Sequence, residues 1–206
     1  MPMLYRLDGA AQAVARLFGA EAGNDPWSGG HAAPGQFAPV ITAGREAVAG
    51  PRPRERTPRR MIPRLWGVPP PPSVQEQRGI LTVRNLDSPF WIGNLRNSEF
   101  RCLVPATAFM EGGRPSPADG KRRQCWFACT DQPVFAMAAV WKDSEIPSFA
   151  LLSCPANAAL KAEGRDTMPV ILPPDPAAQE IWLRGGWDRA KGLVAPYSSS
   201  LMTLRS

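Results

Sequence analysis

One carboxylate in this sequence stands where it could act as a general acid or base. The stretch Phe100–Gly112 reads FRCLVPATAFMEG, and Glu111 is the acidic residue at the end of its apolar run. A carboxylate in such a place is a candidate for moving protons. A lone glutamate before two glycines is more commonly an exposed charge at a strand end, so position alone favours that second interpretation.

Two arginines and one tryptophan could contact a nucleic acid. Arg84 follows a short apolar stretch, where it either binds phosphate or is a solvated charge at a strand end. Arg165 could also bind phosphate, or it could form a surface ion pair with the adjacent Asp166. Trp66 could stack on a base, which typically contributes ~1–3 kcal/mol, although its apolar neighbours favour a place in the core.

In their order along the chain, these residues resemble the motifs of the SOS response-associated peptidase (SRAP) family. The resemblance runs from Pro34 to Leu183 and includes the stretch Asp166–Leu172, which reads DTMPVIL. Members of that family crosslink themselves to abasic sites in single-stranded DNA through a cysteine that follows the initiator methionine. Position 2 of this chain holds Pro2 instead. The resemblance therefore implies a diverged DNA-damage-response protein of the SRAP type.

Further differences fall on residues that the family uses for its chemistry. The thiazolidine crosslink needs an α-amine and a thiolate on one residue. The resemblance also implies a Glu that moves protons, an Arg that holds phosphate, an Asn that orients the sugar and a His that assists ring opening or crosslink reversal. Glu111 and Arg84 match two of these and would flank the site from neighbouring strands, whereas Thr82 replaces the Asn and Arg165 replaces the His. Because Pro2 has no thiolate, and the Asn and His positions are altered as well, we expect no thiazolidine crosslink.

Pro2 leaves one other chemical route open. Removal of Met1 would expose a secondary amine that can condense with an aldehyde to an iminium ion, with Glu111 as the acid or base. The product would be a reversible adduct or strand cleavage by β-elimination. The alternative is that Pro2 is tolerated because catalysis was abandoned, and the changes at Thr82 and Arg165 favour that alternative.

The charge of the chain favours a polyanionic partner. The net charge is +6 and the pI is near 9.6, so clustered arginines and lysines could gain affinity by releasing counterions from phosphates. The segment Arg52–Arg60 is rich in arginine and proline and is expected to be a basic loop or edge hairpin, either solvated or tracking phosphates. The only histidine, His31, either replaces some lost acid–base function or is a loop residue.

We expect no metal, cofactor or membrane partner. The four cysteines, Cys102, Cys125, Cys129 and Cys154, lie in apolar segments without Cys-x-x-Cys pairs, which indicates buried hydrophobic side chains. Neither a signal-peptide pattern nor a run of about 18 apolar residues occurs, so we expect a cytoplasmic protein. A single histidine and the lack of a Gly-x-Ser-x-Gly elbow disfavour a serine-triad hydrolase.

The pattern of elements predicts one α+β domain over residues 1–206. Helices are expected after Asp8, at Ala156–Glu163 and at Pro176–Leu183, the last behind a Pro-Pro-Asp-Pro start signal. Strands are expected at Ala38–Thr42, Met61–Trp66, Ile80–Arg84, Arg101–Ala106, Gln124–Thr130, Val134–Trp141, Ser148–Cys154 and Leu201–Leu204. Grouped strands with a few peripheral helices form a curled or barrel-like, mainly antiparallel sheet. The SRAP resemblance implies the same architecture.

Three functional hypotheses follow. The first is a monomeric SRAP-type pseudoenzyme that binds single-stranded or abasic-site DNA in a basic cleft with Arg84, Arg165 and Glu111, its covalent chemistry altered or lost. The second is a Schiff-base lyase, or a residual autoproteolytic peptidase and hence a hydrolase, acting through Pro2. The third is a non-enzymatic interaction module whose basic charge only maintains solubility.

Overall fold

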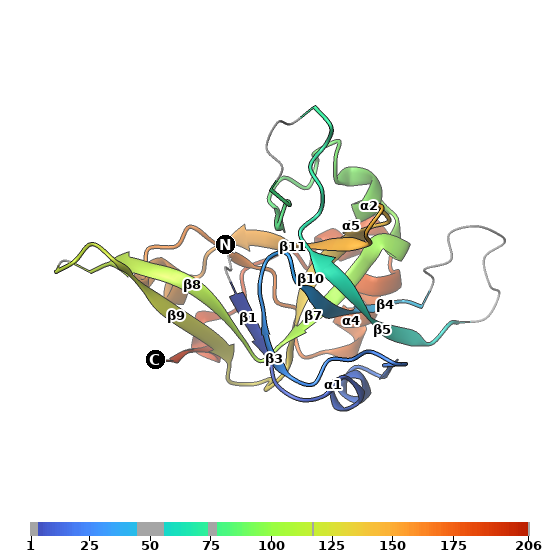
Figure 1. Cartoon of the computed structure of the whole chain (residues 1–206), viewed down its shortest axis with the longest axis horizontal. Helices are drawn as coiled ribbons and strands as arrows, with labels where there is room; N and C mark the ends of the chain where they lie inside the picture. Colours follow the sequence, from blue (N-terminus) through green and yellow to red (C-terminus); the bar gives the residue numbers. More distant parts are fainter. Residues whose placement is uncertain (1–3, 45–55, 74–77, 117, 206) are drawn as a thin grey trace.

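Two β-sheets with short helices around them make up the structure (Figure 1). The computed structural model describes residues 4–44, 56–73, 78–116 and 118–205. Antiparallel pairing dominates both sheets. The predicted α+β class with a mainly antiparallel sheet and few helices is therefore confirmed.

The larger sheet closes on itself. Its ring consists of β5 (Arg59–Trp66), β4 (Phe37–Thr42), β7 (Arg101–Ala106), β10 (Phe135–Lys142) and β11 (Ser148–Pro155), in that order. Neighbours from β5 to β11 pair antiparallel, and β11 returns to β5 in parallel register, with Phe149 opposite Trp66. This last pairing turns the curled sheet into a barrel, as the sequence predicted.

Three short strands extend the barrel, and two of them lie near the candidate residues. β2 (Ala20–Glu21) pairs with the start of β5. β6 (Thr82–Val83) runs parallel to the middle of β11, and β12 (Thr167–Pro169) pairs with its end. The second half of β11 is therefore flanked by β6 and β12.

The smaller sheet carries Glu111. Its order is β13 (Met202–Arg205), β9 (Arg122–Cys129), β8 (Ala108–Pro115), β1 (Leu4–Leu7) and β3 (Gly30–Ala32). The chain passes from β7 into β8 through the single residue Thr107, whose backbone N–H donates to the carbonyl of Arg6 at 2.7 Å. The apolar run around Glu111 is therefore two strands in two sheets, and the β8–β9 hairpin extends away from the barrel (Figure 1).

The N-terminal helix is present but begins differently from the prediction. α1 (Ala11–Leu17) has Ala10 at its N-cap, where no side chain accepts a hydrogen bond. Asp8, the predicted cap, instead accepts hydrogen bonds from Arg6 Nε at 2.7 Å and from the Thr107 hydroxyl at 3.1 Å. Asp8 therefore helps to fix the β7–β8 crossover, and the prediction of a cap at this residue was wrong.

The other two predicted helices are present, and a side chain caps the start of each. Asn157 caps α3 (Ala158–Ala162) by accepting from Leu160 N at 3.1 Å. Asp175 caps α4 (Pro176–Arg184) by accepting from Ala177 N at 2.8 Å, with proline in the first turn. The short α2 (Ile92–Arg96) and α5 (Trp187–Lys191) were not predicted.

Large aromatic side chains fill the core and fasten the helices to it. Trp182 of α4 is fully buried and donates through Nε1 to the carbonyl of Cys102 at 2.9 Å, which ties α4 to β7. All four cysteines are buried and free, as predicted. No helix in the described part of the chain is both long and apolar enough to cross a membrane.

Candidate functional site

Glu111 lies in the middle of β8 and has no exposed surface. Its Oε2 is 2.9 Å from Nη2 of Arg165, whose side chain is one quarter exposed. Burial raises the pKa of the Glu111 carboxyl, and the charge and hydrogen bond of Arg165 oppose that rise. The interpretation of Glu111 as an exposed strand-end charge was therefore wrong, because β8 continues past it to Pro115.

The register of β8 sets what surrounds this carboxylate. Glu111 is opposite Cys125 on β9, and its neighbour Met110 is opposite Leu4, the first described residue of β1. Pro2 lies outside the described residues. The carboxylate thus stands one position beyond the last pair that the structure describes between β1 and β8.

A tight turn after α3 brings Arg165 to the carboxylate. Gly164 has a φ of +75°, which a residue with a side chain rarely adopts, and Arg165 N donates to the carbonyl of Leu160 at 3.0 Å. Ala156 N donates to the carbonyl of Asp166 at 2.9 Å, which closes the loop between α3 and β12. The observed ion-pair partner of Arg165 is Glu111 and not the adjacent Asp166.

Thr82 and Arg84 border a groove of about 820 Å³ on the other side of β11. Thr82 pairs with Leu151 and is buried, whereas Arg84 is exposed just past the end of β6. The groove wall is formed where Gly79 approaches Gly67 so closely that a Cβ on Gly79 would meet Gly67 Cα at 3.0 Å. An exposed guanidinium at such a groove can contact phosphate.

Trp66 also borders this groove, but its side chain is fully buried. The indole lies 5.2 Å from the Tyr5 ring and 6.3 Å from the Phe149 ring, and its Nε1 donates to the carbonyl of Leu81 at 3.3 Å. The ring therefore has no exposed face on which a base could stack. In this structure Trp66 occupies the core position that its apolar neighbours favoured, and it supports the groove from beneath.

The expectation that Glu111 and Arg84 flank the site from neighbouring strands was wrong. Glu111 is in the smaller sheet, whereas Arg84 follows β6, which belongs to the barrel. The one-residue crossover at Thr107 moves the chain from one sheet to the other, and local sequence patterns do not report such a change. Arg84 and Arg165 instead lie next to strands that pair with β11. Arg84 follows β6, and Arg165 precedes β12.

The sequence reasoning missed the arginines of the β8–β9 hairpin. Arg123 Nη2 lies 3.0 Å from Glu163 Oε2, and Arg114 Nε donates to the carbonyl of Ala162 at 2.9 Å. Both contacts join the hairpin to the end of α3, beside the turn that carries Arg165. The basic run Lys121–Arg123 could have revealed this second source of positive charge.

The remaining candidates lie in other places. His31 is on β3 opposite Arg6, exposed, with its ring 5.4 Å from Trp126, so its prediction as a loop residue was wrong. Of the basic segment, Arg52 and Arg54 lie outside the described residues. Arg59 and Arg60 begin β5, which pairs with β2 on one side and β4 on the other, so the prediction of a loop or an edge hairpin was wrong for these two residues. Nowhere among residues that the structure describes do three His, Cys, Asp or Glu side chains gather as a metal site requires.

Comparison with known proteins agrees with this architecture. Residues 4–206 match the family model described as SOS response associated peptidase (SRAP). A crystal structure of a Bacteroides thetaiotaomicron protein is similar with a TM-score of 0.75 and 17% identity, covering 98% of this chain and 90% of that one. A Bordetella bronchiseptica protein has a TM-score of 0.71 and 18% identity over 98% and 97% of the two chains. A phage-related protein of the same organism has a TM-score of 0.72 and 16% identity over 98% and 92%. None of the curated proteins compared matches this chain.

Proposed function

Because the chain belongs to the SRAP family, we propose that it is a DNA-damage-response protein that binds single-stranded or abasic-site DNA with its covalent crosslinking altered or lost. The observation that carries the proposal is the ion pair between the buried Glu111 and Arg165. It joins the carboxylate that would move protons to a side chain that holds its charge at all ordinary pH values. The proposal includes a monomeric state and a cytoplasmic location.

The ion pair supports a loss of proton transfer at this site. A histidine beside Glu111 could relay a proton between the carboxylate and a sugar oxygen, but the Arg165 guanidinium only donates hydrogen bonds. Thr82, which offers one hydroxyl in place of an amide, is buried against β11. The site thus retains groups that hold an anion and lacks groups that pass a proton onward.

The arginines around the site support DNA binding. Arg84 is exposed at the groove beside β6, and Arg122 and Arg123 lie on the hairpin that carries Glu111. Arginine binds phosphate through paired hydrogen bonds and releases counterions from the DNA. We propose that a single strand follows the groove beside β6, with a phosphate on Arg84.

Schiff-base chemistry at Pro2 is the second candidate, and the register of β1 favours it. Leu4 is opposite Met110, and two residues span at most about 7 Å, so Pro2 can reach the neighbourhood of Glu111. The secondary amine would attack the sugar aldehyde, and loss of water would give the iminium ion. Removal of a sugar proton by Glu111 would then expel the 3′ phosphate. A residual autoproteolytic activity through the same amine belongs to this second candidate function, with less support than the Schiff-base reaction.

The binding proposal is tested with a fluorescent single-stranded oligonucleotide that carries one abasic site. We expect wild-type protein to bind it at low salt and to lose affinity as salt rises. Arg84→Ala should weaken binding, whereas the control Arg189→Ala, an exposed arginine on α5, should not. Absence of salt-sensitive binding in the wild type would overturn the proposal and leave an interaction module.

Trapping with borohydride separates the second candidate from the first. An iminium ion is reduced to a stable amine, so protein incubated with the abasic oligonucleotide and borohydride would give a shifted band on a denaturing gel. That band should disappear in Glu111→Ala if the carboxylate assists the reaction. Binding without any trapped band would exclude the Schiff-base candidate.

A further inference from the structure

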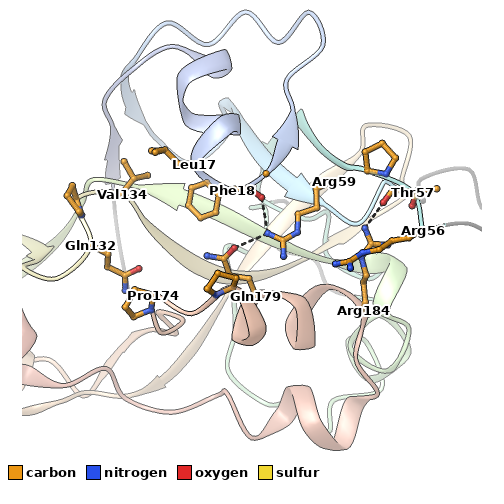
Figure 2. Close-up of a pocket in the computed structure, with 14 residues that line it drawn as sticks. Leu17, Phe18, Arg56, Thr57, Arg59, Gln132, Val134, Pro174, Gln179 and Arg184 are labelled. Atoms are coloured by element: carbon orange, nitrogen blue, oxygen red, sulfur yellow. Dashed lines mark hydrogen bonds between the residues drawn. The ribbon is translucent and has the colours of Figure 1, made fainter.

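A second cavity of about 820 Å³ lies at the other end of β5 from the groove (Figure 2). Arg59 is the first residue of β5 and Trp66 the last, so at about 3.3 Å per residue the two sites are separated by roughly 23 Å. Residues from α1, β5 and α4 line the cavity, together with the loop before β10. The candidate site described above uses none of these side chains.

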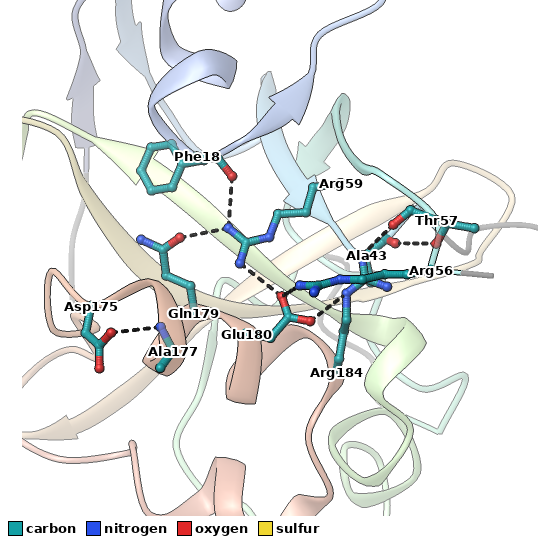
Figure 3. Close-up of polar contacts among 10 residues, drawn as sticks. All are labelled: Phe18, Ala43, Arg56, Thr57, Arg59, Asp175, Ala177, Gln179, Glu180 and Arg184. Carbon is teal, nitrogen blue, oxygen red and sulfur yellow. Dashed lines mark hydrogen bonds and ion pairs between the residues drawn. The ribbon is translucent and has the colours of Figure 1, made fainter.

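Three guanidinium groups line this cavity, and one carboxylate holds them together (Figure 3). Glu180 Oε2 lies 2.7 Å from Arg56 Nη2 and 3.1 Å from Arg59 Nη2, and Oε1 lies 3.0 Å from Arg184 Nε. None of the described residues that line the cavity is acidic. Glu180 contacts the three arginines from outside the cavity lining. Three positive charges against one negative charge leave an excess of about two at the cavity.

Other contacts hold two of these arginines in place. Arg59 Nη1 donates to the carbonyl of Phe18 and to Gln179 Oε1, each at 2.9 Å. Arg184 Nη2 donates to the carbonyl of Thr57 at 2.7 Å. The side chains of Arg59 and Arg184 are only 13% and 12% exposed, so they are fixed before any ligand arrives.

Arg56 differs from the other two arginines because it reaches into solvent. Its side chain is 68% exposed, and its observed ion-pair contact uses only Nη2. Most of its N–H donors are therefore open to solvent at the cavity, where they can bind an anion without breaking the cluster.

The opposite side of the cavity is apolar (Figure 2). Leu17, Val134 and Pro174 lie on that side, away from Arg56 and Arg184. Leu17 is 66% exposed and presents apolar surface at the end of α1. The amide of Gln179 lies between the apolar and the charged side, whereas Gln132 lies beside Val134 and Pro174 (Figure 2). The cavity is thus built for a ligand with an anionic end and a compact body that presents an apolar face.

We propose that this cavity binds a phosphate monoester with a ring-containing body, of the class of a nucleoside monophosphate. The phosphate would lie on Arg56, Arg59 and Arg184, and the body would lie against Leu17 and Val134. A phosphate monoester carries about −1.5 to −2 charges at pH 7, which matches the excess of the cluster better than a single carboxylate does. The same chemistry occurs in a free mononucleotide and at a 5′-phosphorylated DNA end. The inference does not depend on the proposed function of the Glu111 site.

Calorimetric titration of the full chain with thymidine 5′-monophosphate tests the proposal. We expect saturable binding that is about fivefold weaker in Arg56→Ala and unchanged in Arg189→Ala, which removes the same charge from α5. Leu17→Asp should also weaken binding, because it places a negative charge at the apolar side. Both substitutions are at exposed positions, so unfolding does not obscure the result.

Matched ligands decide which part of the nucleotide is recognised and from which source it comes. Thymidine should bind far more weakly than the monophosphate, and inorganic phosphate should bind more weakly than the monophosphate too. Equal binding of thymidine and its monophosphate, or no binding of the monophosphate, would overturn the proposal. A preference of Arg84→Ala protein for a 5′-phosphorylated over a 5′-hydroxyl oligonucleotide would assign the site to a strand end, and no preference would assign it to a free nucleotide.

Discussion

Glu111 and Glu180 are both held by arginines, yet their surroundings move their pKa values in opposite directions. Glu111 is fully buried with the ion-pair contact of Arg165, and burial raises its pKa. Glu180 is about one third exposed and contacts three arginines. Burial also acts to raise the pKa of Glu180, but the hydrogen bond of Arg59 and the charges of Arg184, Arg56 and Arg59 outweigh it and lower that pKa.

The opposite pKa shifts show that a glutamate paired with arginine can serve two purposes. The buried Glu111 carboxylate stays easy to protonate, because desolvation outweighs the attractions that lower its pKa. A carboxylate among three guanidinium groups remains ionised and leaves positive charge to spare. The first arrangement suits a residue inherited from proton chemistry, and the second suits a site that binds anions.

The largest expected effect comes from removing the guanidinium that forms the ion pair with Glu111. Arg165→Met should lower the free energy of unfolding by about 3 kcal/mol near pH 8, because it leaves a buried carboxylate without its guanidinium. The folded-state pKa of Glu111 is raised, so its protonated form is favoured by folding and stability falls as pH rises through that pKa. The loss should therefore shrink as the pH is lowered toward the ordinary pKa of glutamate.

Urea unfolding of Arg165→Met at several pH values checks this prediction. Arg189→Met is the control, since it removes an exposed arginine of the same size. An equal loss at all pH values would mean that the Arg165 side chain acts through packing and not through the charge of Glu111.

A smaller effect with the opposite pH dependence is expected at the other cluster. Glu180→Gln should cost about 1 kcal/mol at pH 7, since the carboxylate is partly exposed and solvent screens it. The folded-state pKa of Glu180 is lowered, so its contribution is present above the ordinary pKa of glutamate and is lost as the pH falls through the folded-state value. Unfolding curves of wild type and variant should converge in acid, and a gap that widens in acid would contradict the comparison.

The smallest effects concern binding and should separate the two sites. Arg84→Ala should reduce the slope of log affinity against log salt for single-stranded DNA by about 0.7, the loss of one phosphate contact. It should leave binding of thymidine 5′-monophosphate unchanged, whereas Arg56→Ala should do the reverse. Fluorescence anisotropy measures DNA binding and calorimetry measures nucleotide binding for each variant. If either variant lost affinity for both ligands, the two ligands would share one site.

The sequence predicted the strands better than their assembly. The range Met61–Trp66 lies within β5, and the helix start at Asp175 was read from its capping signal. Closure of the barrel depends on the parallel contact of β11 with β5, between segments about eighty residues apart, and no local pattern encodes such a pairing. The crossover at Thr107 was missed for the same reason, so β8 was not predicted as a strand of its own.

The candidate site was predicted in its residue types and not in its contacts. The SRAP motifs singled out Glu111 and Arg165, but their ion pair depends on the turn at Gly164 that follows α3. Trp66 was given two interpretations, and only its packing between Tyr5 and Phe149 distinguishes them. The Glu180 cluster was missed because two of its arginines, Arg56 and Arg59, are more than a hundred residues away in the chain. The third, Arg184, has helical i, i+4 spacing from Glu180, which the sequence does show.

The most direct test of the central claim is a search for covalent product between the wild-type protein and an abasic-site oligonucleotide in the absence of any reductant. Intact-mass measurement and a denaturing gel would compare wild type with a triple variant, Pro2→Cys with Thr82→Asn and Arg165→His, which restores the three altered positions. The account predicts that wild type binds the oligonucleotide in a salt-sensitive way and gives no stable covalent product. A stable product formed by the wild-type chain would contradict the claim that its crosslinking chemistry is altered or lost.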